Sequence, residues 1–139
     1  MDGIRRPPGK AEEMTDYSKI TILAVDDVAL NLLLVKKILQ RYNFRIRTAD
    51  SGVKALEEVA AEKPDLILLD ILMPGIDGFE VLSRLKADWN TKDIPVIILS
   101  ALNSNKDIVR AYEMGAKDYI TKPIIMEKLI NSVARNLGL

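Results

Sequence analysis

From Lys19 onward, short apolar runs alternate along the chain with longer stretches in which apolar residues recur at helical spacing. The short runs are rich in β-branched residues, which predicts strands, whereas the longer stretches have the periodicity of amphipathic helices. The predicted strands cover residues 20–25, 44–48, 66–69, 95–99 and 119–121. The predicted helices cover approximately residues 30–41, 52–59, 78–87, the stretch around 108–112, and 125–136.

This alternation of strand and helix is typical of an α/β fold with a mostly parallel sheet and helices on both of its faces. We expect the doubly wound, flavodoxin-like (βα)5 arrangement, a five-stranded parallel sheet with the strand order 2-1-3-4-5. In the second strand, Phe44 and Ile46 alternate with Arg45 and Arg47, which indicates a half-exposed strand near a sheet edge. Residues 1–18 mix glycine and proline with charges and lack periodicity, so they are predicted to form a flexible leader before one domain at 19–139.

The composition narrows the possible chemistry. Hydrophobic residues make up 48% and charged residues 29% of the 139 positions, as in a globular domain. Lys and Arg (20) balance Asp and Glu (20), so we expect no direct binding to nucleic acid or to a membrane. Cys and His are absent, which excludes thiol nucleophiles, imidazole bases and His-ligated zinc and leaves the oxygen ligands that favour Mg²⁺. No apolar run is long enough for a secretion signal or a membrane span, so a cytoplasmic location is expected.

Polar residues stand directly after the predicted strands: Asp26, Asp27, Asp70, Ser100 and Lys122. In an open parallel sheet, ligands bind beyond the carboxyl ends of the strands where the strand order reverses, so these residues are candidates for one site. Individually, Asp27 could instead cap the helix that follows, Ser100 could cap its own helix or turn, and Lys122 could be a solvated loop residue. Three adjacent carboxylates repel one another unless a dication or an ammonium lies among them, so the group predicts a Mg²⁺ site beside a lysine.

Such a group of residues suits phosphoryl transfer. An ionised aspartate is a competent nucleophile toward phosphorus and forms an aspartyl-phosphate. Catalysis consists mainly of positioning and of neutralising charge on the transferred group, which Mg²⁺, a hydroxyl and an ammonium can supply. A carboxylate needs no general base, so the lack of histidine does not impede the receiving side of the reaction. The phosphoryl donor must then be another molecule.

Several short motifs occur in a specific order and spacing. They are Val-Asp-Asp at 25–27, Leu-Asp-Ile-Leu-Met-Pro-Gly at 69–75 with Asp-Gly at 77–78, Ile-Leu-Ser-Ala at 98–101, and Gly-Ala-Lys-Asp-Tyr-Ile-Thr-Lys-Pro at 115–123. With these motifs, essentially the whole stretch 19–139 resembles the receiver domains of two-component response regulators.

The resemblance implies a role for each matching residue. Asp70 would be the phosphoacceptor, and Ser100 and Lys122 would contact the phosphoryl oxygens, with Lys122 paired to Asp70 beforehand. The Mg²⁺ ligands would be Asp26, Asp27, Asp70 and the backbone carbonyl of Leu72. The peptide bond between Lys122 and Pro123 would be cis.

The resemblance also implies a switch and its partners. Movement of Ser100 toward the phosphoryl group would leave space for Tyr119 to rotate inward, which would change the surface of the fourth helix, fifth strand and fifth helix. The expected partners are a histidine kinase or histidine phosphotransfer protein, and a downstream effector or output domain that reads this surface. The domain would not be an enzyme beyond phosphorylating itself and losing the group slowly. Leu72 and Leu102 occupy positions where polar side chains can orient a water, and both are apolar here.

Alternative interpretations differ in how well the residues fit them. The chain could be a pseudo-receiver that keeps the fold without the chemistry, a stand-alone regulator, or a piece of a hybrid histidine kinase. A haloacid-dehalogenase-like phosphohydrolase would need a second aspartate where Leu72 stands. A nucleotide or flavin binder would need a Gly-rich loop after the first strand, where Asp26 and Asp27 stand. Residues 3–10 end in Gly-Lys like a phosphate-binding loop, but their spacing and the following Ala11 do not fit one.

Overall fold

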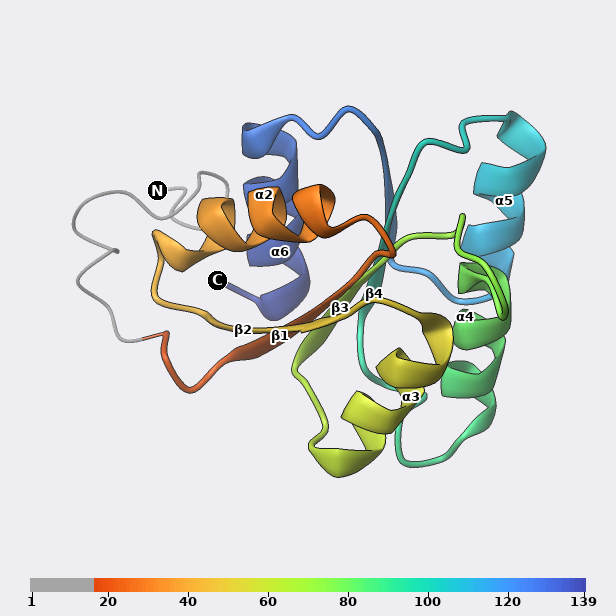
Figure 1. Ribbon diagram of the computed structural model, residues 1–139, viewed down its shortest axis with the longest axis horizontal. Coiled ribbons are helices and arrows are strands. Elements are labelled where there is room, and N and C mark those ends of the chain that lie inside the picture. Colours follow the sequence, from red (N-terminus) through yellow and green to blue (C-terminus); the bar gives the residue numbers. More distant parts are fainter. Residues whose placement is uncertain (1–16) are drawn as a thin grey trace.

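The computed structural model describes residues 17–139, in which strands and helices alternate (Figure 1). The strands are β1 (Thr21–Val25), β2 (Arg45–Ala49), β3 (Leu66–Leu69), β4 (Val96–Ser100) and β5 (Asp118–Thr121). The helices are α2 (Ala29–Gln40), α3 (Gly52–Ala61), α4 (Gly78–Ala87), α5 (Asn105–Glu113) and α6 (Met126–Leu137). All strand pairs are parallel and the strand order is β2-β1-β3-β4-β5. The predicted flavodoxin-like fold and its strand order are confirmed.

The sheet separates two hydrophobic cores. Successive residues of a strand point to opposite faces, so strands that are apolar throughout supply both cores. On one face, Leu23 and Ile67 pack with residues of α3, α4 and α5. On the other face, Ile22 and Leu68 pack with residues of α2 and α6. Figure 1 shows the same division of the helices between the two sides of the sheet.

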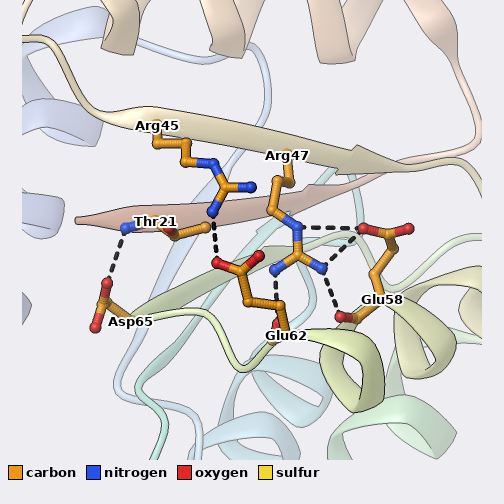
Figure 2. Close-up of polar contacts among 6 residues, drawn as sticks. All are labelled: Thr21, Arg45, Arg47, Glu58, Glu62 and Asp65. Atoms are coloured by element: carbon orange, nitrogen blue, oxygen red, sulfur yellow. Dashed lines mark hydrogen bonds and ion pairs between the residues drawn. The ribbon is translucent and has the colours of Figure 1, made fainter. Parts of the chain in front are cut away.

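β2 is an edge strand, as its alternating pattern predicts, and its two arginines reach toward α3 (Figure 2). The side chain of Arg47 is only 12% exposed. It donates to the carboxylate of Glu58 and to the backbone carbonyls of Glu58 and Glu62. Arg45 pairs with the carboxylate of Glu62, where both side chains are half exposed. Arg47 therefore connects the C-terminal turn of α3 to the edge of the sheet through a largely buried contact, whereas the contact of Arg45 is half exposed to solvent.

The packed domain includes a residue before the first strand. Tyr17 is buried and stacks on Phe44, with ring centroids 5.2 Å apart. Tyr17, which belongs to the predicted leader, is therefore part of the hydrophobic core on the α2–α6 face. Residues 1–16, which include the Gly-Lys stretch at 3–10, lie outside the described residues.

Local signals set the ends of most helices. Ser51, Asp77 and Ser104 are the N-cap residues of α3, α4 and α5, and each side chain accepts a hydrogen bond from a backbone N–H in the first turn. Gly138 ends α6 in the left-handed conformation, with φ 74°. The longest described helices, α2 and α6, have 12 residues each. Within residues 17–139, no helix combines the length and apolar character needed to cross a bilayer.

Periodicity located the helices without always identifying their buried faces. On α2, Val35, Ile38 and Leu39 are buried, whereas Leu30 and Leu33 are 71% and 48% exposed. An apolar repeat shows which residues share a helix face, but the rotation of the helix against the sheet decides which of them are covered. The N-terminal half of α2 consequently exposes leucines that the sequence pattern groups with its core residues.

Candidate functional site

The aspartates at the ends of β1 and β3 meet because these strands are neighbours. Val25 is in register with Leu69, and the N–H of Asp70 donates to the carbonyl of Val25 at 3.0 Å. The next residues along the two strands therefore lie side by side at the carboxyl edge of the sheet. One carboxylate oxygen from each of Asp26, Asp27 and Asp70 lies within 4.8 Å of the other two. Asp26 and Asp70 are buried, whereas Asp27 is exposed.

Lys122 reaches this acidic cluster from the end of β5, the opposite edge strand. Its ammonium donates to Asp26 at 2.6 Å and to Asp70 at 3.0 Å, and its side chain is 15% exposed. Burial lowers the pKa of Lys122, but the hydrogen bonds and charges of Asp26 and Asp70 outweigh it, so the pKa is raised above its ordinary value. The lysine is therefore a charged member of the cluster, and the solvated-loop interpretation of Lys122 is wrong. The peptide bond that follows it, to Pro123, is cis as expected.

Three of the polar side chains are oriented in the same way by the chain that follows them. Asp26 accepts a hydrogen bond from the N–H of Val28, and Asp70 accepts one from the N–H of Leu72. The Oγ of Ser100 accepts one from the N–H of Leu102. Each contact spans two residues, the geometry in which Asp and Ser side chains stabilise a turn. The turns that end β1, β3 and β4 thus fix the directions of the groups that the sequence singled out.

Ser100 and Tyr119 occupy the β4–β5 side of the site. Ser100 is fully buried at the end of β4, opposite Thr121 of β5. The hydroxyl of Tyr119 donates to the backbone carbonyl of Leu102, in the loop that follows Ser100. Burial raises the pKa of Tyr119, and the influence of the Ser100 hydroxyl partly opposes this effect. The hydroxyl of Tyr119 is therefore bound to the loop at the site rather than only to water.

The structure decides between the alternatives for Asp27 and Ser100. Asp27 does not cap α2, because the N-cap residue is Val28 and no side chain caps that end. Ser104 caps α5, whereas Ser100 stabilises the turn after β4 by accepting a hydrogen bond from the N–H of Leu102, so the turn alternative for Ser100 is confirmed.

The acidic cluster fits Mg²⁺ by charge and by ligand type. Three carboxylates and the single ammonium of Lys122 leave an excess of two negative charges, which one dication would neutralise. The ligands are hard oxygens, as Mg²⁺ requires, and the chain contains no Cys or His to favour a softer metal. Asp26, Asp27 and Asp70 are the side chains that could hold it.

Sequence reasoning missed two features of the site. A Cβ at Gly78 would lie 2.3 Å from the backbone carbonyl oxygen of Asp70, so only glycine lets α4 begin directly behind that residue. The Asp-Gly pair at 77–78 was the available signal, because glycine after a cap residue permits a close backbone approach. The carbonyl of Leu102, which holds the hydroxyl of Tyr119, had no sequence signal because every residue has one.

Comparison with known proteins identifies the family. A sequence model described as the response regulator receiver domain matches residues 22–134, a range that contains the whole acidic cluster and Lys122. The chain belongs to the response regulator receiver domain family. This receiver domain is 44% identical over 103 residues to Response regulator PleD of Caulobacter vibrioides. The aligned region covers 74% of this chain and 23% of PleD. It is also 35% identical over 112 residues to Protein PilH of Pseudomonas aeruginosa. Here the aligned region covers 81% of this chain and 93% of PilH.

Solved structures show the same relationship. A putative response regulator from Chloroflexus aurantiacus has a TM-score of 0.82 and 31% identity, over 86% of this chain and 98% of that one. The chemotaxis protein CheY4 of Vibrio cholerae has a TM-score of 0.80 and 28% identity, over 85% of this chain and 98% of that one.

Receiver domains are phosphoacceptors of two-component systems, and they interact with histidine kinases and with downstream effector domains. They generally bind Mg²⁺ at an aspartate cluster of the kind present here. The chain spans 23% of PleD and 28% of a probable cyclic di-GMP phosphodiesterase of Vibrio cholerae, to which it is 40% identical over 124 residues. The chain thus covers only about a quarter of the length of these two relatives.

Proposed function

We propose that Asp70 accepts the phosphoryl group in this receiver domain, from a phosphohistidine of a histidine kinase or a histidine phosphotransfer protein. The observation that carries the proposal is the bridge that Lys122 makes between Asp26 and Asp70, with Asp27 beside them. Burying charged groups costs free energy, and clusters of such groups occur preferentially at functional sites. The chain contains no histidine, so the donor phosphohistidine lies outside these 139 residues.

The transfer itself needs one nucleophile and a set of fixed charges. A carboxylate oxygen of Asp70 attacks phosphorus, so that a P–O bond forms as the P–N bond of the donor breaks and its electron pair returns to the imidazole. The N–H of Leu72 and the ammonium of Lys122 hold the carboxylate of Asp70 in place before the reaction. Lys122 and the hydroxyl of Ser100 then stabilise negative charge on the phosphoryl oxygens.

Asp26, Asp27, Asp70 and the backbone carbonyl of Leu72 would hold Mg²⁺. When bound, the ion supplies charge neutralisation for the phosphoryl group. Asp26 is already fixed by the N–H of Val28, and Asp27 is exposed, so the cluster is open to solvent on one side.

The proposed output follows from the position of Tyr119. Its hydroxyl is bound to the loop after Ser100, so movement of Ser100 toward a phosphoryl group on Asp70 acts directly on the surroundings of this side chain. Tyr119 lies on β5, between α5 and α6, and we assign the α5–β5–α6 face to the downstream effector or output domain. Beyond its own phosphorylation and a slow loss of the group, the domain performs no catalysis in this proposal, and it acts in the cytoplasm.

The decisive experiment is incubation of the wild-type chain and the Asp70→Asn variant with Mg²⁺ and acetyl phosphate or phosphoramidate, read by intact mass. We expect one phosphoryl adduct on the wild type, none on the variant, and none on the wild type when EDTA removes Mg²⁺. Asp27→Asn is the matched variant that keeps the nucleophile. Its phosphorylation should need a higher Mg²⁺ concentration than the wild type does.

A pseudo-receiver is the alternative that this experiment separates from the proposal. Its folded wild-type chain would acquire no phosphoryl group from either donor, and the Asp70→Asn variant would keep full biological activity. An adduct that persists in Asp70→Asn would place the acceptor elsewhere in the chain and would overturn the assignment of Asp70.

A further inference from the structure

The only tryptophan of the chain lies on the surface opposite the acidic cluster. Trp89 follows α4, in the loop that leads into β4, and is 82% exposed. β4 begins at this edge of the sheet, whereas Asp70 and Ser100 stand at the edge where strands end. Exposure of so large an apolar side chain has a cost in water, and tryptophan is among the residues most enriched at the centres of protein interfaces.

The loop holds Trp89 in a defined position. The carbonyl of Asp88 accepts hydrogen bonds from the N–H groups of Thr91 and Lys92, and the Asp88 carboxylate accepts one from the N–H of Asn90. The ammonium of Lys92 lies 4.5 Å from the centre of the indole ring, within the range of a cation–π contact. An anchor that is already ordered loses little conformational entropy when it binds.

An open pocket of about 600 Å³ lies next to Trp89, between α3 and α4. Leu56, Val59 and Leu85 give it apolar walls, and Asp88 and Asn90, the two neighbours of Trp89 in the chain, also line it. Binding pockets of this size enclose most of a small organic molecule, so an indole ring can be accommodated.

The charges around Trp89 and the pocket are of both signs. Three residues are basic and four are acidic: Lys63, Arg84 and Lys92, with Glu62, Asp65, Asp88 and Asp93. A surface of one sign would repel a copy of itself, whereas this surface can face itself across a two-fold axis with opposite charges opposed.

We propose that this surface, formed by Trp89 and the α3–α4 pocket, binds a second copy of the chain, with Trp89 of each copy in the pocket of the other. A two-fold interface requires the projecting group and the receiving pocket on the same patch, which is the arrangement present here. The contact leaves the carboxyl edge of the sheet free, so it does not depend on the phosphoryl chemistry of Asp70, and the Asp70→Asn variant should associate as the wild type does.

The single tryptophan makes the test direct. Sedimentation velocity and tryptophan fluorescence are measured on the full chain from about 1 µM to about 1 mM. We expect the sedimentation coefficient to rise from monomer to dimer, with a parallel shift of the emission to shorter wavelength and a loss of iodide quenching. Trp89→Ala should remain monomeric. Ala60→Arg, an exposed substitution that fills the pocket and keeps the fluorophore, should remain monomeric with a solvent-like emission.

Leu30→Ala is the control, because Leu30 is 71% exposed on α2, outside this surface, and its loss should leave association unchanged. A chain that stays monomeric over the whole range, with Trp89 accessible to iodide, overturns the proposal. So does a dimer whose tryptophan emission does not shift, or one that Trp89→Ala still forms, because the copies would then meet through another surface.

Discussion

The ammonium of Lys122 lies 3.0 Å from the carboxylate of Asp70, although 52 positions separate the two residues in the chain. The same ammonium lies 2.6 Å from Asp26, 96 positions away. One positive charge thus holds together two carboxylates from two different strands. The site depends on this contact, and its removal has consequences that can be measured.

Replacement of Lys122 by Met should lower the free energy of unfolding at neutral pH by roughly 1–3 kcal/mol, because two buried carboxylates lose their shared donor. Mg²⁺ should raise the melting temperature of this variant more than that of the wild type, because the dication then meets the carboxylates without a competing ammonium. Thermal unfolding with and without Mg²⁺ measures both effects. Lys106→Met, at an exposed position of α5, is the control and should unfold like the wild type. If Mg²⁺ stabilises Lys122→Met and the wild type equally, the prediction is contradicted.

The pH dependence of the Lys122 effect follows from the raised pKa. A group whose pKa is raised on folding stabilises the folded state fully below its unfolded value, here about 10.5, and loses this contribution as the pH rises through the folded value. The difference in stability between wild type and Lys122→Met should therefore be constant from about pH 7 to about pH 9. A difference that shrinks within this range would show that Lys122 loses its proton too early to act as a fixed charge.

The contribution of Asp118 to the stability of the fold should depend on pH in the acidic range. Burial raises its pKa, but hydrogen bonds from Ser132, the N–H of Tyr119 and Tyr112, with the charge of Arg135, reverse the effect and leave the pKa below 3.8. Its contribution to stability is thus complete above the unfolded pKa and is lost as the pH falls through the folded value. Asp118→Asn should cost about 1 kcal/mol at pH 7, allowing for solvent screening, and the cost should shrink progressively as the pH falls below the unfolded pKa of about 3.8.

Urea denaturation of wild type and Asp118→Asn at a series of pH values checks this expectation. Asp93→Asn, at a highly exposed carboxylate on the loop before β4, is the matched control and should show no such dependence. A cost that stays constant down to acid pH would mean that the asparagine amide disturbs packing, and that the carboxylate charge is not what stabilises the junction of β5, α5 and α6.

The lifetime of the phosphorylated form should be set by two leucines. Leu72 is 51% exposed beside Asp70 and Leu102 is half buried beside Ser100, so neither can hydrogen-bond a water aligned with the aspartyl-phosphate. The wild type should lose its phosphoryl group slowly after the small-molecule donor is removed. Leu72→Asn should lose it about tenfold faster, as expected if one added hydrogen bond lowers the barrier by about 1.4 kcal/mol.

Intact mass at timed intervals gives both decay rates. Leu34→Asn, a similarly exposed leucine on α2, is the control and should decay at the wild-type rate. Loss of the wild-type phosphoryl group within seconds would contradict the assignment of slow autodephosphorylation to these positions.

Two arginines of β2 offer a matched pair for testing stability. Arg47→Lys should destabilise the domain by roughly 1–2 kcal/mol, because lysine cannot make the several directed hydrogen bonds to Glu58 and Glu62 that the guanidinium makes (Figure 2). Arg45→Lys, one pleat away on the same strand, should have no resolvable effect, because its pair with Glu62 is exposed. Urea denaturation compares the two variants, and equal losses would show that Arg47 contributes no more than a surface charge.

Much of the fold was predictable because its elements are specified locally. Leu66–Leu69 is apolar throughout and flanked by polar residues, so the sequence predicted the bounds of β3 as the structure has them. The helices predicted at 52–59 and 78–87 likewise begin where α3 and α4 begin, directly after the cap residues Ser51 and Asp77. Where boundaries differed, long-range pairing decided: Ser100 belongs to β4 because it is in register with Thr121 of β5, a partner that no local pattern reveals.

Much of the site was also predictable, because its residues stand at strand ends and parallel strands end at one edge of a sheet. The sequence by itself determined which residues these are, including Asp70 and Lys122, and that their charges require one another. The pairing of Lys122 with Asp70 was expected, and only the tertiary structure decided that Lys122 also contacts Asp26, that α2 exposes Leu30, and that Trp89 projects beside an open pocket. Residue type and spacing act within a few positions, whereas the rotation of a helix and the meeting of distant side chains depend on how all the elements pack together.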